Sequence, residues 1–319
     1  MSTTTDLFDM EADDASMKSL DNKSKVTDGI YRIDPKLAKD KAKGYVATIR
    51  FLPNLLTDGT LGLSAIEKGV HYAKLQDYPD LQGYYDSLTN HGEKCPLTTM
   101  YWKLKNSKNQ AEVERAALIS KTTKFYSYIL VIEDEQQPEL EGKILIYPYG
   151  FKIKNKINLE RTGENSDGKK CNVFDPANGK DFRLIVKTVG EWPNYDSSMF
   201  RAISPLKIWD EDKSRFVEVP VTFDETKDKN VISNPKVQEK VINFLKSKTV
   251  NMDDHMAKPW SDEVRAKVDK IIDILSGRDV ATARETIGRA SNTTTSTPVS
   301  DTDFDDESDE EDDFFSDNK

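Results

Sequence analysis

Residues 121–149 read KTTKFYSYILVIEDEQQPELEGKILIYPY and carry the strongest fold signal in the chain. The two apolar runs, 124–132 and 143–149, are rich in the β-branched and aromatic residues that strands favour. The link between them is polar and contains a proline and a glycine, as connections between strands do. We therefore predict two neighbouring strands here, within a mainly β fold.

Other segments extend this pattern in both directions. Strand composition recurs at 45–52 (YVATIRFL), 182–189 (FRLIVKTV) and 216–223 (FVEVPVTF). Helical periodicity occurs at 111–119, 236–247 and 262–276, the last between an N-cap at Ser261 and a stop at Gly277. Strands at this spacing are typical of a barrel or sandwich, so the predicted class is α+β, mainly β.

Composition divides the chain into four regions. They are a disordered arm at 1–28, a β domain at 29–224, a helical region at 225–289, and a flexible linker with an acidic tail at 290–319. Within the β domain, residues 54–100 are rich in Gly, Asp and Tyr. That stretch predicts loops and short elements of a flanking subdomain.

The net charge of −10 is unevenly distributed. Residues 301–319 hold eleven acids and one base, and residues 1–21 hold six acids and one base. Residues 22–300 therefore carry a charge of +5. A basic middle between acidic ends is compatible with a nucleic-acid partner, although the net charge is negative.

Several classes of protein are disfavoured. Cys95 and Cys171 form no disulfide framework and suit a reducing compartment. No apolar run reaches the roughly 18 residues of a membrane span, and no signal-peptide core is visible. The chain has three histidines and no P-loop, nucleophile-elbow or dinucleotide motif. We expect an intracellular protein that is not an enzyme.

Aromatic and basic residues lie beside each other on three predicted strands. They are Lys121, Lys124, Phe125, Tyr126 and Tyr128; then Lys143, Tyr147 and Tyr149, running on to Phe151, Lys152, Lys154 and Lys156; then Arg183 and Lys187, followed by Trp192 and Tyr195. Non-specific single-strand binders use bases for phosphates and aromatic faces for nucleobases. The same rings are also ordinary strand residues that pack in cores, so both interpretations stay open.

These stretches resemble the single-stranded DNA-binding (helix-destabilising) protein family of T-even-type tailed bacteriophages. The similar segments are ATIRFLP at 47–53, KTTKFYSYILVIEDEQQPELEGK at 121–143, YPYGFKIKNKIN at 147–158 and FRLIVKTVGEWPNYDSSMF at 182–200. The resemblance implies an OB-fold core at 29–224 whose cleft holds single-stranded DNA. It further implies roles in phage replication, recombination and repair in the host cell cytoplasm.

The resemblance also implies residue roles by position. The implied DNA-facing aromatics are Tyr126, Tyr147, Tyr149, Trp192 and Tyr195, and the implied phosphate-facing bases are Arg50, Lys121, Lys124, Lys152 and Lys187. The tail at 301–319 resembles a regulatory tail that contacts phage replication and recombination proteins and competes with DNA. Two rival classes remain: an acidic-tailed chaperone or scaffold for basic proteins, and a nucleic-acid enzyme such as a nuclease.

The chain departs from the family at a zinc site of one His and three Cys. Only His71 and Cys95 remain of the four ligands. Thr98 stands where the Cys-Pro-x-Cys pair would end, and Tyr85 stands ten residues before Cys95. His91 could substitute for one ligand, but no fourth is visible, and a structural zinc normally needs four. We predict no metal cofactor.

A second departure concerns self-association. The family uses a short basic N-terminal cluster for head-to-tail contacts on DNA. This chain opens with the acidic stretch TTTDLFDMEADDAS, and its nearest bases are Lys18, Lys23 and Lys25. Cooperative binding is therefore either absent or made through another contact.

Overall fold

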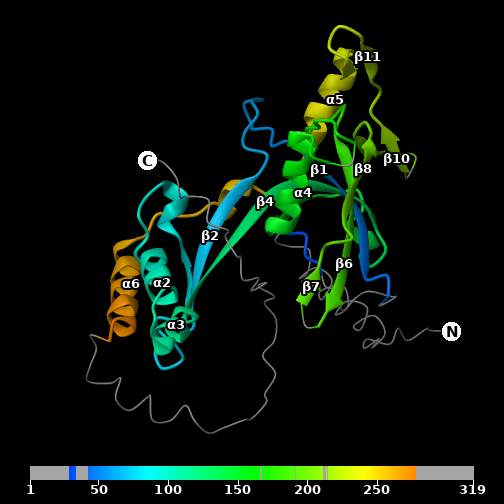
Figure 1. Ribbon diagram of the computed structural model, residues 1–319. Coiled ribbons are helices and arrows are strands. Elements are labelled where there is room, and N and C mark those ends of the chain that lie inside the picture. The colour runs from blue at the N-terminus through cyan, green and yellow to red at the C-terminus, as the bar shows by residue number, and fades with distance from the viewer. Residues whose placement is uncertain are drawn as a thin grey trace, which may run out of the picture. The chain divides into compact units, whose positions relative to one another are not determined.

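The computed structural model describes residues 29–33, 42–165, 167–190, 192–210, 213 and 215–277 (Figure 1). The predicted arm at 1–28, the linker and tail at 290–319, and residues 278–289 lie outside them. The described part mixes helices with a mainly antiparallel sheet, in agreement with the predicted α+β class. None of its helices is both long and apolar enough to cross a membrane.

One large sheet and two small ones make up the β structure. The large sheet contains β1 (Tyr45–Phe51), β2 (Ile66–Ala73), β3 (Gly83–Asp86), β4 (Ile119–Asp134), β5 (Ile144–Tyr149), β6 (Lys180–Val189), β7 (Trp192–Asn194) and β8 (Met199–Ile203). Its order is β3-β2-β4-β1-β6-β7, with β5 on β4 and β8 on β6. The small sheets pair β9 (Lys207–Asp210) with β10 (Arg215–Glu218) and β11 (Thr222–Asp224) with β12 (Lys229–Val231).

Five helices accompany the strands in the described residues. They are α2 (Pro96–Lys105), α3 (Gln110–Ala116), α4 (Phe151–Thr162), α5 (Pro235–Lys246) and α6 (Asp262–Leu275). The predicted caps of the last helix are confirmed. The Ser261 side chain accepts a hydrogen bond from the Val264 backbone N–H at 3.3 Å, and Gly277 follows the helix with a φ of 70°.

The chain forms two compact units. In described residues, the first comprises 29–66, 125–188 and 194–255, and the second comprises 67–124, 189–193 and 256–277. The segment predicted as one helical region is thus distributed over both, because α5 packs in the first unit and α6 in the second.

Strand alternation builds two cores in the first unit. Phe125 lies in a cluster with β1, β5 and β6 side chains, whereas Tyr126 and Tyr128 lie in a cluster with α5. β1 is central: Ile49 pairs with Val131 of β4 on one side and with Phe182 of β6 on the other. Phe125 therefore lies on the opposite face of β4 from Tyr126 and Tyr128, as the two-residue period of a strand requires.

The second unit has its own apolar core, formed by α2, α3, α6 and the β2–β3 hairpin. Leu97, Met100 and Leu104 provide the buried stripe of α2. The Trp260 indole N–H donates to the Asp86 carbonyl oxygen at 2.6 Å, which ties the segment before α6 to β3.

Three secondary-structure predictions need correction. Residues 96–105 and 151–162 are helices. The first overlaps the stretch 54–100, for which we predict loops and short elements, and the second contains residues 151–156, which we group with the predicted strand at 143–149. The segment 216–223 is two short strands, because Pro220 lies between β10 and β11 and has no N–H for a ladder.

Candidate nucleic-acid interface

Helix α4 carries the densest group of bases near aromatic rings in the first unit. It begins after Gly150, and Ile153 and Ile157, four residues apart, bury one stripe of it. Lys152, Lys154 and Lys156 alternate with these residues and are partly exposed. Burial of the isoleucines therefore fixes the helix while its lysines remain accessible to solvent.

Lys154 lies over two rings. Its Nζ atom is 5.0 Å from the centroid of Phe125 and 5.2 Å from that of Phe151, and these rings meet edge to face at 5.2 Å. A cation over aromatic faces is held by the ring quadrupoles. The ammonium group is thereby positioned beside aromatic surface.

Lys152 and Lys156 converge on the turn that follows β7. The Lys152 Nζ atom is 3.6 Å from a carboxylate oxygen of Asp196, and the Lys156 Nζ atom donates to the Asp196 carbonyl at 3.2 Å. The Asn194 side-chain amide, followed by Lys152, lowers the pKa of Asp196. Lys152 thus contacts the carboxylate of Asp196, and Lys156 contacts the backbone carbonyl of the same residue.

We call this group the α4 surface. It consists of Phe151, Lys152, Lys154, Lys156 and Tyr195. Tyr195 is half-buried and packs against the core that contains Phe125 and Ile153. Two of its five members, Lys152 and Tyr195, were among the residues implied by the resemblance.

Two further implied residues of the first unit are partly accessible. Lys187 is half-buried on β6, with its stem over Gly44, where a Cβ atom would lie 2.9 Å from Lys187 Cγ. Tyr126 is half-buried on β4 and stacks on His255, with 5.9 Å between ring centroids and 16° between planes.

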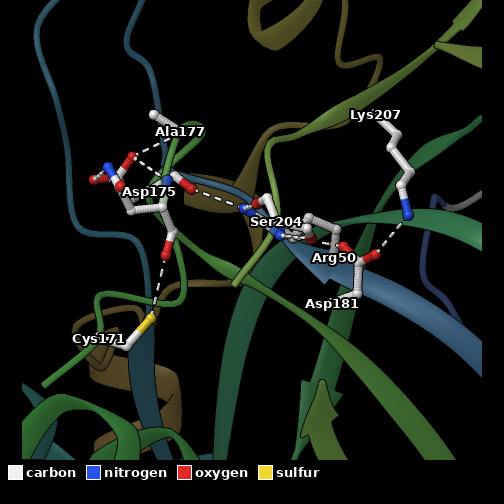
Figure 2. A network of polar contacts seen from close by, with 8 residues as sticks. Arg50, Cys171, Asp175, Ala177, Asp181, Ser204 and Lys207 are labelled. Carbon is white, nitrogen blue, oxygen red and sulfur yellow. Dashed lines mark hydrogen bonds and ion pairs between the residues drawn. The ribbon is translucent and has the colours of Figure 1, made fainter. Parts of the chain in front are cut away.

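Arg50 differs from its implied role as a phosphate contact. Its side chain is 1% exposed. One Nη atom lies 3.1 Å from Asp181 and 3.3 Å from Ser204 Oγ, and the other donates to the carbonyls of Asp175 at 2.9 Å and Ser204 at 3.0 Å (Figure 2). The guanidinium group is engaged inside the protein and cannot reach a phosphate in this conformation.

The residues around Arg50 balance its charge and leave space for its side chain. Burial lowers the pKa of Arg50, while Asp181 opposes that effect. Lys207 Nζ holds the second oxygen of Asp181 at 3.2 Å. A Cβ atom at Gly179 would lie 2.6 Å from Arg50 Nη2, so only glycine fits there. The arginine therefore ties β1 to β6 and to the loops around Asp175 and Ser204.

Tyr147 and Tyr149 also differ from their implied role. They share one face of β5, as alternation predicts, but that face is the core, and the rings are 2% and 3% exposed. Burial raises the pKa of Tyr149 to about 12, although the hydroxyl contacts Ser127 Oγ at 2.9 Å. These rings have no open face on which a base could stack in this conformation.

The second unit contains the remaining implied residues. Trp192 is 52% exposed. Lys121 and Lys124 are three positions apart on β4 and therefore point to opposite faces of the strand. Lys121 shares the face of Gly69, because its Cε atom is 3.6 Å from where a Cβ atom on Gly69 would lie.

At the zinc site implied by the resemblance, His71 contacts the hydroxyl of Thr98. His71 is buried, and its ring nitrogens contact the Ile119 carbonyl at 3.2 Å and Thr98 Oγ1 at 2.8 Å. Ser87 Oγ lies 3.3 Å from the Thr98 hydroxyl, whereas Tyr85 donates to the Leu81 carbonyl elsewhere. Ser87, and not Tyr85, therefore lies beside Thr98, which contacts His71.

These residues do not fit a tetrahedral zinc. Burial raises the pKa of the Cys95 thiol, but hydrogen bonds led by His71 outweigh it and bring the pKa to about 6. Thr and Ser hydroxyls are not among the usual zinc ligands, which are Cys, His and carboxylates. Among the described residues, no group of three or more His, Cys, Asp or Glu is placed to hold a metal.

We expect the fold of the second unit to be independent of metal. A strong chelator should leave the thermal unfolding midpoint unchanged, because hydrogen bonds and apolar packing stand where a metal would otherwise stabilise the fold. Differential scanning calorimetry with and without chelator, alongside metal analysis, measures this. One equivalent of zinc, removable only by the chelator and with a fall in the midpoint, would contradict it.

Comparisons with known proteins agree with the resemblance found in the sequence. The single-stranded DNA-binding proteins of Enterobacteria phage T2 and Enterobacteria phage T4 are each 30% identical to the chain over 169 residues. The match covers 52% of this chain and 53% of each relative, so it spans about half of their length. The family model described as "gp32 DNA binding protein like" matches residues 43–259, and the chain belongs to this family of DNA-binding proteins, which are not enzymes.

Proposed function

We propose that this chain binds single-stranded DNA without sequence preference and catalyses no reaction. The observation that carries the proposal is the α4 surface, where three lysines lie beside half-buried rings on a helix that its buried isoleucines fix in place. Single-strand binders combine these two elements, because lysines follow the phosphates and rings stack on any base. The names of the phage T2 and T4 relatives agree with it.

The proposed contacts differ from those implied by resemblance alone. In the first unit the proposed contacts are Tyr126, Lys152, Lys154, Lys156, Lys187 and Tyr195. In the second unit they are Lys124 and Trp192 on one side and Lys121, which lies on the opposite face of its strand from Lys124. Arg50, Tyr147 and Tyr149 act as structural residues, because they are buried. An OB-fold core is part of the proposal, supported by the antiparallel strands that enclose one apolar cluster.

Titration with oligo-dT separates this proposal from its rivals. Intrinsic tyrosine and tryptophan fluorescence should be quenched as bases stack, and the oligonucleotide should stay intact with Mg²⁺ present. A flat titration would favour the chaperone or scaffold for basic proteins. Cleavage products would favour a nuclease.

The acidic tail adds a regulatory element to the proposal. Eleven carboxylates at 301–319, attached through a linker, compete with DNA for basic surfaces, and DNA binding releases the tail for replication and recombination proteins. The proposal includes roles in phage DNA replication, recombination and repair in the host cytoplasm.

Deleting residues 301–319 should raise the affinity for oligo-dT, most strongly at low salt, because the competition is ionic and salt screens it. Filter binding at low and high salt, with the full chain as the reference, measures the effect. If the full chain and the deletion variant bind oligo-dT with equal affinity at low salt, the tail does not compete with DNA and serves only to keep the protein soluble.

Head-to-tail self-association on DNA would need a contact other than a basic N-terminal cluster, because the first 21 residues are acidic. Binding isotherms on short and long oligonucleotides address it. Tighter binding per site on the long strand would demonstrate cooperativity, and equal binding would exclude it.

A further inference from the structure

The β2–β3 hairpin of the second unit has one face outside the core. His71 and Ala73, at odd positions of β2, are buried, and Ala73 packs with the apolar cluster of that unit. Successive strand residues point to opposite faces, so Lys68, Val70 and Tyr72 point away from that cluster. This outer face contains both bases and aromatic rings.

An aromatic pair forms the centre of the face. Tyr72 and Tyr84 are directly opposite in the antiparallel register, with ring centroids 4.6 Å apart and 38° between planes. The Gln82 side-chain amide donates to the Tyr72 hydroxyl at 3.1 Å. Tyr84 is nevertheless 50% exposed, so its ring is held in place by a neighbour and still has surface open to solvent.

Lysines surround this pair. Lys74 directly follows β2, is exposed, and continues the strand through a hydrogen bond from its N–H to the Leu118 carbonyl at 2.8 Å. Lys68 forms an ion pair with Asp86 at 3.0 Å, which balances the one carboxylate on the outer face of β3. The face therefore keeps a positive charge.

Lys124 belongs to the same face. β4 lies next to β2 in the sheet, and its odd-numbered Ile119 and Lys121 share the side of Ala73 and Gly69. Even-numbered residues of β4 consequently point to the side of Tyr72. We call Lys68, Tyr72, Lys74, Tyr84 and Lys124 the hairpin face.

We propose that the hairpin face is a second binding surface for single-stranded DNA, in which a base stacks on Tyr84 and Lys74 and Lys124 bind the flanking phosphates. The inference rests on the proposed function and extends it to residues outside the α4 surface. A cross-strand tyrosine pair by itself stabilises a hairpin. Partly exposed rings with more lysines than carboxylates beside them are what a stacking platform for a polyanion needs.

Substitution of Tyr84 in the full chain tests the inference. Tyr84→Ala should weaken oligo-dT binding about five- to hundredfold, which is the range for loss of one base–aromatic stack. Tyr84→Phe keeps the ring and should bind like the wild type. The matched control is Phe223→Ala, which removes a 56% exposed ring from β11 in the first unit and should leave affinity unchanged. Thermal unfolding of each variant checks that it is folded.

Photocrosslinking gives a second measurement that does not depend on variant stability. Oligo-dT containing 5-iododeoxyuridine, irradiated on the wild-type protein, should attach to Tyr84 or Tyr72 in peptides identified by mass spectrometry. If the wild type binds DNA, the inference is overturned by equal affinities of Tyr84→Ala and wild type, or by crosslinks confined to other residues. If the wild type does not bind oligo-dT, the proposed function itself fails.

Discussion

Replacing Arg50 with methionine should destabilise the first unit by about 3–5 kcal/mol, the usual loss when one partner of a buried ion pair is removed. The substitution leaves Asp181 with Lys207 alone and removes the donors to the carbonyls of Asp175 and Ser204. Unsatisfied buried acceptors add to the loss. Chemical denaturation followed by circular dichroism measures it.

Arg183→Met is the matched control, because Arg183 is an exposed arginine on β6. A surface substitution of this kind should change stability by less than about 0.5 kcal/mol. If Arg50→Met does not fold, Arg50→Lys, which keeps the charge but loses the planar fork, should fold with an intermediate loss of stability. Stability equal to that of Arg183→Met, together with weaker and less salt-dependent DNA binding, would show that Arg50 contacts phosphate after all.

The double substitution of Lys152 and Lys156 with alanine should give the largest loss of DNA affinity, about tenfold or more at low salt. Each lysine that neutralises a phosphate of a single strand contributes about 0.7 to the slope of log affinity against log salt. The double variant should therefore have a slope smaller in magnitude by about 1.4. Asp196→Asn should act in the opposite direction, because it removes the carboxylate beside Lys152.

Helix α5 provides the control for this pair. Lys236 and Lys240 have the same four-residue spacing on a helix of the same length and unit, and both are exposed. Their double alanine variant has the same net charge as the Lys152 and Lys156 variant, so a general charge effect would appear equally in both. Equal salt slopes for the two double variants would show that the α4 surface does not contact DNA.

The strands were predictable because their side chains satisfy a local rule. The β-branched and aromatic run at 124–132 lies within β4, and 182–189 within β6. Helix α4 was missed because the alternation Phe-Lys-Ile-Lys at its start is also a strand pattern. Its helical pattern is confined to Ile153 and Ile157, and only packing decides whether the segment becomes a helix or a strand.

The candidate site was harder to predict, because alternation shows which residues share a face but not which face is the core. Alternation puts Tyr147 and Tyr149 on one face of their strand, but the packing of Phe51 and Phe125 against Tyr149 makes that face the interior. The burial of Arg50 depends on its ion pair with Asp181, which is 131 residues away in the chain. Contacts at such separations leave no local sequence pattern.

The hairpin face has a local pattern in the sequence. Lys68, Tyr72 and Lys74 occupy alternate positions in the sequence KGVHYAK, which is the period of a strand. The surrounding Gly, Asp and Tyr residues favoured a loop interpretation. Only the pairing of Tyr72 with Tyr84 reveals that the residues share one face.

The salt dependence of oligo-dT binding by the full chain tests the central claim most directly. If lysines bind phosphates while rings stack on bases, log affinity should fall linearly with log salt, with a slope of several times about −0.7, and quenching should accompany binding. Absence of binding at low salt, or an affinity that does not change with salt, would contradict the account.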